Sequence, residues 1–519
     1  MKRNILILTL LLTGCVSTYA QKNTSDSVVK VSGTVTDGHE AVVGANVFVK
    51  GTIDGCLTDS LGRFSFTTTA ADSAVLMVTC MGYDDCRRML AKRQQPLTIR
   101  LRERTTTIDE VVVTGSTFSF GQANGMKQMD ALDVVQDGGS CGDIVAALQS
   151  LPGTQKVGEN GKLYVRGGDS EECQTYVNGM HVLRPYTTSA PDSPSRGRFS
   201  PFLFKGINFS LGGYDAEYGQ ALSSVLPMET TDASTSDKLG VSASLNDWNF
   251  GGTKATKVGS WSMNAAYTDL GLYNRLFPDR WTWHEPYRQF SGETQWKMQP
   301  TTSSVWKTYL GFDRTTLSLD TDGRRLDLGE SNLYLNSVVK GSGKGGLTWF
   351  AGASGSLVWE RVDGAVVASD SYCHRMSELH VKAKVSKRLS PAVKATLGAE
   401  SFLRHAWIDY HTPVDYHSLP GNPSSTDYHY ASDTHLPALF AETQLRLLRH
   451  LFAEASLRTE YTSRSHHWSI MPRLLLNYRP TTCWLFTLSA GQYAQEATDT
   501  IQMRSLGTLR PATATHYIA

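Results

Sequence analysis

The chain has 519 residues, more than one ordinary domain holds, so two or three domains are expected. A formal net charge of +1 by itself suggests neither a nucleic-acid binder nor an enzyme for acidic substrates. The 45 glycines and 10% aromatic residues, beside only 19% charged residues, favour β-structure with many turns. This composition does not exclude a membrane β-barrel, because barrel strands alternate apolar and polar residues and give no hydropathy peak.

Residues 1–20 are predicted to be an export signal peptide. A charged start, an apolar core over residues 5–12 and the small residue Ala20 before Gln21 fit such a signal. The core is too short to span a bilayer as a helix. The preceding Leu-Thr-Gly makes Cys15 similar to a lipidated cysteine, so lipidation there is the alternative to simple cleavage between Ala20 and Gln21, which we favour. Either interpretation predicts export from the cytoplasm.

The eight cysteines are irregularly spaced and form no CxxC pair, so no metal site is predicted. A disulfide between Cys80 and Cys86 is left open, because an oxidising compartment would permit it. Small buried residues are the favoured interpretation of the cysteines.

Residues 28–103 are predicted to form a β-sandwich of short strands separated by Gly and Asp turns. No nucleophile, metal triad or carboxylate pair stands out, so no catalytic residue is predicted. The stretches GTVTD, VVGANVFVKGT, TDSLGRFSF and MGY resemble the carboxypeptidase regulatory-like domain over nearly the whole module. The resemblance implies an accessory β-sandwich and not peptidase activity.

Residues 104–118 are predicted to be a linker that contains a run of β-branched residues between acids and glycine. Such a run predicts a strand with little of its own to pair with. It is either an edge strand of the preceding sandwich or a segment that adds to a partner's sheet by main-chain hydrogen bonds. The run resembles the TonB box that precedes the plug of TonB-dependent receptors. Its residues are Ile108, Asp109, Glu110, Val111, Val112, Val113, Thr114 and Gly115.

Residues 119–232 are rich in glycine and in short predicted elements. Apolar residues at helical spacing over 143–151 predict a helix stopped by Pro-Gly, and the Asn-Gly pair in YVNGM predicts a hairpin turn. The Gly-Gly pair lacks the spacing of a phosphate loop. The set LQSLPGT, VRGGDS, YVNGM and GGYDAEYGQALSSVL strongly resembles the plug of TonB-dependent outer-membrane receptors. The plug-motif residues are Arg166, Gly167, Gly168, Asp169, Asn178, Gly179, Gly212, Gly213, Glu217, Tyr218 and Gly219.

The resemblance implies a plug inside a 22-stranded barrel, remodelled by energy that the inner-membrane TonB complex transmits. A barrel lumen is polar, so the plug needs a polar outer face. For Arg166 an ion pair that locks the plug in place is favoured over ligand contact. The charged residues expected on this face are Arg166, Asp169, Glu171, Glu172, Arg184, Arg196, Arg198, Asp215 and Glu217.

Residues 233–519 contain eleven alternating segments and a possible twelfth from His516 onward. Most are near the 9 to 11 residues that a tilted membrane strand needs, with Trp and Tyr near their ends. The polar stretches 274–303 and 405–435 are expected to be extracellular loops. By resemblance, the segments form an antiparallel transmembrane β-barrel with about 11 to 12 of 22 strands, so an incomplete barrel and a truncated chain are predicted.

The stretch 405–435 repeats an Asp-Tyr-His triplet, at 409–411, 415–417 and 427–429. In an extended chain the Asp and His of each triplet share a face, which leaves a metal or metal-chelate site as one interpretation. A solvated polar loop is favoured, because no HxH or HxxxH pair accompanies the triplets.

We therefore expect a mainly β protein: an N-terminal β-sandwich, a small α+β plug and a C-terminal barrel in the cell outer membrane. By resemblance it is not an enzyme and has no cofactor or nucleic-acid partner; its partners are TonB, outer-membrane lipid and a small ligand such as a siderophore, cobalamin, peptide or glycan. Asn178 departs from the Ile-Asp-Gly form usual in the glycan-importing subgroup, so the ligand stays open. The alternative is a secreted or surface β-sandwich binding protein without transport. A continuous apolar band with aromatic ends on the outward face of the C-terminal strands would indicate the membrane protein.

Overall fold

The structure of the protein is a computed structural model in two units, Met1–Thr107 and Ile108–Ala519. The signal peptide, the TonB-box-like segment and the middle Asp-Tyr-His triplet lie outside the residues that the structure describes. It describes all residues except 1–28, 39–40, 43–44, 51, 53, 60, 69–73, 81–85, 90–95, 102–125, 130, 141, 158–160, 189–195, 235, 279–280, 302, 322, 366–368, 391, 413–425, 449, 481–483 and 506.

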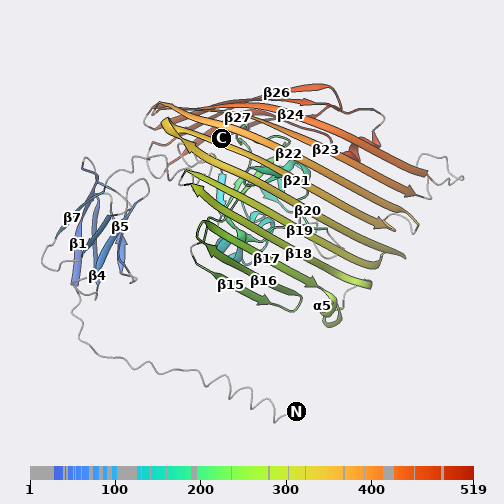
Figure 1. Ribbon diagram of the computed structural model, residues 1–519, viewed down its shortest axis with the longest axis horizontal. Coiled ribbons are helices and arrows are strands. Elements are labelled where there is room, and N and C mark those ends of the chain that lie inside the picture. Colours follow the sequence, from blue (N-terminus) through green and yellow to red (C-terminus); the bar gives the residue numbers. More distant parts are fainter. Residues whose placement is uncertain are drawn as a thin grey trace, which may run out of the picture. The chain divides into compact units, whose positions relative to one another are not determined.

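The first unit consists of two small sheets, as the sequence predicts for a β-sandwich (Figure 1). Alternate residues such as Val31, Val47 and Leu76 are fully buried and form one apolar core. Cys86 is a free thiol packed against this core, so it does not pair with Cys80. One sheet has the order β4(Arg63–Thr68), β1(Val29–Thr36), β7(Leu97–Arg100), and the other β3(Gly55–Leu57), β2(Asn46–Val49), β5(Val75–Thr79), β6(Cys86–Met89).

The second unit begins with the plug, whose central sheet has the order β12-β11-β14-β13-β8. The helix predicted over 143–151 is shorter, α4(Ile144–Leu148). Asp143 caps its start by accepting a 2.9 Å hydrogen bond from the amide of Val145. The Asn-Gly hairpin turn is confirmed between β11 and β12. The other bounds are β8(Met126–Met129), α3(Ala131–Gln136), β9(Thr154–Gln155), β10(Tyr164–Val165), η1(Ser170–Glu172), β11(Cys173–Val177), β12(Met180–Val182), η2(Pro201–Leu203), β13(Phe204–Ser210) and β14(Ser224–Thr230).

The rest of the second unit is a wall of 14 antiparallel strands, each paired with the next along the chain (Figure 1). It comprises β15(Lys238–Ala243), β16(Asp247–Thr256), β17(Gly259–Asp269), β18(Thr282–Thr301), β19(Ser304–Thr321), β20(Arg324–Gly343), β21(Leu347–Asp363), β22(Ser371–Ser390), β23(Val393–Thr412), β24(Thr426–Leu448), β25(Leu451–Thr462), β26(His467–Tyr478), β27(Phe486–Gln495) and β28(Ala512–Ile518), with α5(Gly271–Leu276), η3(Lys344–Gly346) and α6(Asp499–Arg504) in the connections.

The expected count of 11 to 12 strands is wrong, because β16 and β18 were not recognised. Most of the loop expected over 274–303 is β18, and both ends of the loop expected over 405–435 are strand. Strands β18 to β24 are 17 to 23 residues long, about twice what a bilayer requires. The extra length carries polar residues on both faces, so it has no apolar alternation by which the sequence would reveal it.

The two faces of the wall differ as a membrane wall requires. Outward side chains such as Leu335, Leu357 and Leu403 are 36% to 47% exposed, whereas their inward neighbours are mostly polar and buried. On β21 the outward residues Trp349 and Trp359 stand ten positions apart, with Ala, Gly and Leu between them. Trp261, Trp296 and Trp306 continue the Trp349 end, where the connections are short turns. This is the apolar band with aromatic ends that indicates a membrane protein.

No described helix has the length and apolar character needed to cross a membrane.

Candidate functional site: the interface between plug and wall

The plug loop 211–223 connects β13 to β14 and lies against the inner face of the wall. Gly212 and Gly213 have φ of +115° and +70°, a region that favours glycine. A Cβ at Gly212 would lie 2.8 Å from Ile518, and one at Gly213 would lie 2.5 Å from the hydroxyl of Ser489. The two glycines therefore let the plug backbone turn directly against β27 and β28.

Glu217 is the centre of a buried ion-pair cluster between this loop and β22. Its carboxylate contacts Lys384 and lies 3.7 Å from the ammonium of Lys382, which also donates a 2.7 Å hydrogen bond to the Glu217 carbonyl. Burial alone would raise the pKa of Glu217, but the ammonium groups of Lys384 and Lys382 outweigh it and hold the pKa below its usual value. Glu217 is therefore charged and paired, as expected for a group that fastens the plug.

Tyr218 and Gly219 extend the same contact. The Tyr218 ring packs edge-on against Tyr176 at 4.8 Å and faces the Lys382 ammonium at 5.2 Å. The Tyr176 hydroxyl donates a 2.8 Å hydrogen bond to the Gly219 carbonyl. A Cβ at Gly219 would lie 2.2 Å from the Arg458 guanidinium, so glycine is required for this close approach.

Arg458 on β25 is fully buried and links the wall to the plug. Its guanidinium pairs at 2.6 Å with Glu400 and with Glu460, and it donates a 3.3 Å hydrogen bond to the carbonyl of Ala216. On β26, Arg473 donates to the carbonyls of Tyr214 and Tyr218 at 3.0 and 3.2 Å. We call the set Glu217, Tyr218, Gly219, Lys382, Lys384, Arg458 and Arg473 the plug latch.

A second polar contact joins β12 of the plug to β22. His181 donates its amide to the Nδ1 of His380 at 3.1 Å, and its ring lies 2.7 Å from the carboxylate of Glu378. Glu378 in turn pairs at 2.5 Å with Arg404 on β23. The side chains of His181, His380 and Glu378 are at most 4% exposed. No bulk water therefore separates the plug from the wall here.

Three further plug charges reach the wall elsewhere. Arg184 pairs with Glu360 at 2.9 Å, and Arg198 pairs with Asp313. Glu229 lies 2.8 Å from Lys340 and 3.4 Å from Lys307. Burial would raise the pKa of Glu229, but Lys340 and Lys307 lower it to about 2.

Arg166, Gly167, Gly168 and Asp169 occupy the turn after β10. Arg166 is exposed and has a φ of +51°, and it has no ion pair among the described residues, contrary to expectation. Asp169 accepts a 3.2 Å hydrogen bond from the amide of Glu171 and so caps η1. These residues shape the turn.

Asn178 and Gly179 form the hairpin turn inside the plug. Asn178 is fully buried with a φ of +55°, and its side-chain oxygen accepts 3.0 and 2.9 Å hydrogen bonds from Thr230. Asn tolerates this backbone region better than most residues, which explains its use. Its role in the structure is therefore the joining of two plug strands.

Sequence reasoning found Arg184, Arg198 and Glu217 but missed their partners on the wall. Those partners are inward residues of β19 to β22, on strands where inward charged residues alternate with outward apolar ones. The pattern VKAKV around Lys382 and Lys384 is an example. In this pattern every second residue is charged, so these side chains share one face of the strand. The pattern could therefore have indicated a lumen with charged partners for a plug.

The Asp-Tyr-His triplets that the structure describes lie on strands and not in a loop. In the register of β23 and β24, Asp409 faces His429 and His411 faces Asp427. The ring of His429 lies 2.6 Å from the Asp409 carboxylate, and His411 contacts Asp427. Each imidazole is therefore engaged by one cross-strand carboxylate. No group of three or more possible ligands that could hold a metal ion occurs in the described part of the chain.

A polar plug fastened by buried ion pairs inside an antiparallel wall, with an outward apolar band, defines the fold of a plugged outer-membrane barrel. Comparisons with known proteins agree. Residues 31–113 match the family model of the CarboxypepD_reg-like domain. The matched range includes the TonB-box-like segment as far as Val113. The chain is 35% identical over 100 residues to the TonB-dependent receptor SusC of Bacteroides thetaiotaomicron, which covers 19% of this chain and 9% of that protein.

Two solved structures share the fold. The ferric enterobactin receptor PfeA of Pseudomonas aeruginosa superposes with a TM-score of 0.56 at 15% identity, covering 72% of this chain and 62% of that one. The outer membrane transporter YddB of Escherichia coli gives 0.56 at 11% identity, covering 72% and 61%. The first unit is thus a CarboxypepD_reg-like domain, and the second has the plug-and-wall fold of TonB-dependent receptors. The chain spans less than two thirds of the length of these structures.

Proposed function

We propose that the protein is a TonB-dependent receptor of the outer membrane, which imports a small ligand when its plug is remodelled. The observation that carries the proposal is the plug latch, because it joins plug and wall through buried charges and hydrogen bonds, beside smaller aromatic contacts such as that of Tyr214 with Tyr493. Polar contacts of this kind exchange for water at small net cost, since each lost hydrogen bond can be replaced. A gate that must open and re-form needs such an interface.

The outward apolar band favours this proposal over a secreted or surface β-sandwich protein. A soluble protein rarely exposes large contiguous apolar surface, whereas the band between Trp349 and Trp359 spans many strands. Outer-membrane lipid is the partner that such a band requires. The fold neighbours include a ferric enterobactin receptor in complex with enterobactin and the copper transporter OprC. For this chain the ligand class remains a siderophore, cobalamin, peptide or glycan.

The proposal also includes TonB as a partner, which binds residues 108–115. This run of β-branched residues suits addition to a partner's sheet by main-chain hydrogen bonds. Because the CarboxypepD_reg-like match reaches Val113, the competing role is a last strand of the first unit.

The experiment that tests the proposal measures binding of the isolated periplasmic domain of TonB to the detergent-solubilised protein. Val111→Pro removes a main-chain donor inside the segment, so we expect binding to weaken by about tenfold or more. Thr106→Pro, just outside the segment, is the matched control and retains binding. If the wild-type protein binds no TonB domain, or if Val111→Pro only unfolds the first unit without weakening binding, the proposed contact is wrong.

A further inference from the structure

Two lysines of the wall stand directly opposite each other on its inner face. Lys297 on β18 and Lys307 on β19 are cross-strand partners, and the two residues are only 2% and 3% exposed. Their chain neighbours Trp296 and Trp306 are exposed and point outward. Like charges that face each other across a sheet destabilise it, and burial removes the water that would otherwise solvate them. A pair of this kind is stable only if anions lie close to it.

Lys307 has such an anion. Its ammonium donates a 3.1 Å hydrogen bond to the carbonyl of Thr230 and lies 3.4 Å from the carboxylate of Glu229. The same carboxylate lies 2.8 Å from the ammonium of Lys340 on β20. One plug carboxylate is therefore shared between two lysines of the wall.

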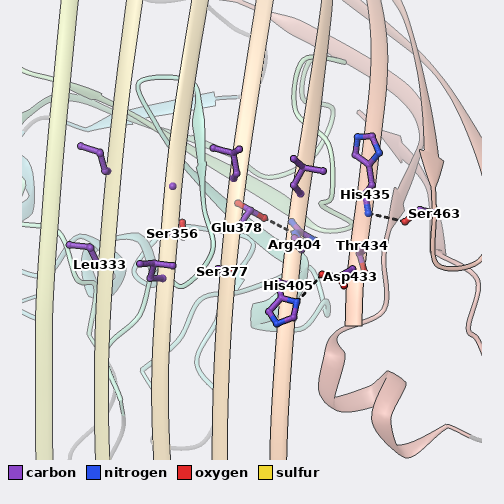
Figure 2. A pocket seen from close by; sticks show the side chains of 15 residues that line it. Leu333, Ser356, Ser377, Glu378, Arg404, His405, Asp433, Thr434, His435 and Ser463 are labelled. Carbon is purple, nitrogen blue, oxygen red and sulfur yellow. Dashed lines mark hydrogen bonds and ion pairs between the residues drawn. The ribbon is translucent and has the colours of Figure 1, made fainter. Parts of the chain in front are cut away.

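Lys297 lacks a direct partner of this kind. Its ammonium makes no hydrogen bond with any described residue, and the one described carboxylate within 4.0 Å of it is Asp232, at 3.8 Å. Asp232 instead accepts 2.9 Å hydrogen bonds on both oxygens from Lys205 of the plug. Figure 2 shows a direct pair on the same wall, in which Glu378 meets Arg404 at 2.5 Å. A buried ammonium without such a contact indicates a place for an anion.

The charges of this group do not balance. It comprises four lysines and two carboxylates, so two positive charges are in excess when all six groups are ionised. One doubly charged anion would bring the total to zero. Lysine ammonium groups bind phosphate as point charges, which suits a group of lysines that converge from different strands. We call Lys205, Lys297, Lys307 and Lys340 the lysine site.

The lysine site lies near the end of the wall where the strands are joined by short turns. Strand β18 ends at Thr301 and β19 begins at Ser304, three positions before Lys307. In outer-membrane barrels the short turns are periplasmic. The side chain of Asp232 is 43% exposed, so it can turn into the solvent and admit an ion beside Lys297.

We propose that the lysine site binds a doubly charged oxyanion of the phosphate class between the plug and the wall. The oxyanion replaces Asp232 beside Lys205 of the plug and Lys297 of the wall. It stabilises the docked plug, because these two lysines meet only when the plug is docked. The alternative is a Lys297 that has lost its proton on burial and requires no anion. The inference rests on the plug-and-wall fold and not on transport or on TonB.

The test is a calorimetric titration of the full protein in detergent with inorganic phosphate at about pH 8, where a phosphate carries close to two charges. Lys297→Met and Lys205→Met each remove one ammonium and should weaken phosphate binding by about tenfold to a hundredfold. Asp232→Asn removes the competing carboxylate and should strengthen binding by about tenfold. Lys254→Met is the matched control, because Lys254 is an exposed lysine of the same wall that pairs with Asp237. It should bind phosphate as the wild type does.

A second probe identifies the source of the phosphate. Glycerol 3-phosphate carries the same dianionic group on a larger molecule. Its binding would show that the site accepts the phosphate group of a larger ligand, whereas binding of inorganic phosphate alone would assign the site to the free ion. Phosphate should also raise the denaturation midpoint of the wild type and not that of Lys297→Met, because a ligand of the docked state stabilises that state.

Each outcome decides the inference. Phosphate binding that is lost in Lys297→Met and Lys205→Met and kept in Lys254→Met supports the site. No binding to the wild type, or unchanged binding in Lys297→Met, overturns it and favours the uncharged lysine. Displacement of phosphate by an equal concentration of chloride shows a general charge effect and also overturns it. Circular dichroism checks the folding of every variant; if Lys297→Met does not fold, Lys205→Met and Asp232→Asn decide, and a failed TonB assay leaves these results unaffected.

Discussion

The inward and outward faces of β20 to β25 are made by the same strands but serve two different solvents. At β25, the inward Arg458 is fully buried and paired with two carboxylates, while its outward neighbour Leu457 is 44% exposed. At β22, inward Lys382 is buried against the plug, and outward Val381 is 47% exposed. One step along a strand thus exchanges an ion pair for a lipid contact, because successive side chains of a strand point to opposite faces.

The two faces differ in which substitutions reduce the stability of the folded protein. Inward charges are desolvated and favourable only while their partners are present, so the loss of one partner is costly. Outward apolar residues lose little when one is shortened, because lipid fills the space. The inner face should therefore be sensitive to loss of charge, and the outer face to gain of charge.

Arg458→Ala is expected to have the largest effect, because it leaves Glu460 buried without a cation and Glu400 with only Lys382 at 3.6 Å. Breaking a buried pair by removing one partner costs about 3–5 kcal/mol. Chemical denaturation in detergent measures the loss. Leu457→Ala on the same strand is the outward control and should cost far less. Equal losses in the two variants would contradict the comparison.

Val381→Lys tests the outer face by the opposite change. A lysine near the middle of the apolar band should lower the free energy of folding into lipid vesicles by about 2–4 kcal/mol. Val381→Leu keeps the position apolar and should fold as the wild type does. If Val381→Lys folds equally well into vesicles, the band does not lie in the membrane.

Gly219→Ala separates close packing from charge. The new Cβ would lie 2.2 Å from the Arg458 guanidinium, and that side chain is fixed by two carboxylates. Overpacking of this kind costs about 1–3 kcal/mol. Gly355→Ala, on the outward face where a Cβ meets nothing within 4 Å, is the matched glycine control. Similar denaturation midpoints for the two variants would show that the latch has room to adjust.

The sequence predicted the outward face better than the inward one, for a physical reason. Family motifs located Glu217, Tyr218 and Gly219, and alternation located most strands between their aromatic ends. Lys382, Arg458 and Glu378 were missed because their partners lie 165 to 242 residues away in the chain, and only the register of the wall brings them together. The long polar halves of β18 and β24 were assigned to loops, since strands wet on both faces lack a period of two. An ion pair was expected at Arg166 because a charged residue in a family motif was assumed to lie at the interface between plug and wall.

A pH dependence is also expected at Glu229, on the inward side of the comparison. Its pKa is lowered from 4.5 to about 2, so its ion pairs with Lys340 and Lys307 stabilise the docked plug fully above pH 4.5. That contribution is lost as the pH falls through about 2, because protonation removes the charge. The difference in unfolding free energy between wild type and Glu229→Gln should therefore shrink between pH 4.5 and pH 2. Denaturation midpoints across this range measure it, and a difference that stays constant down to pH 2 would show that these lysines do not hold the carboxylate charged.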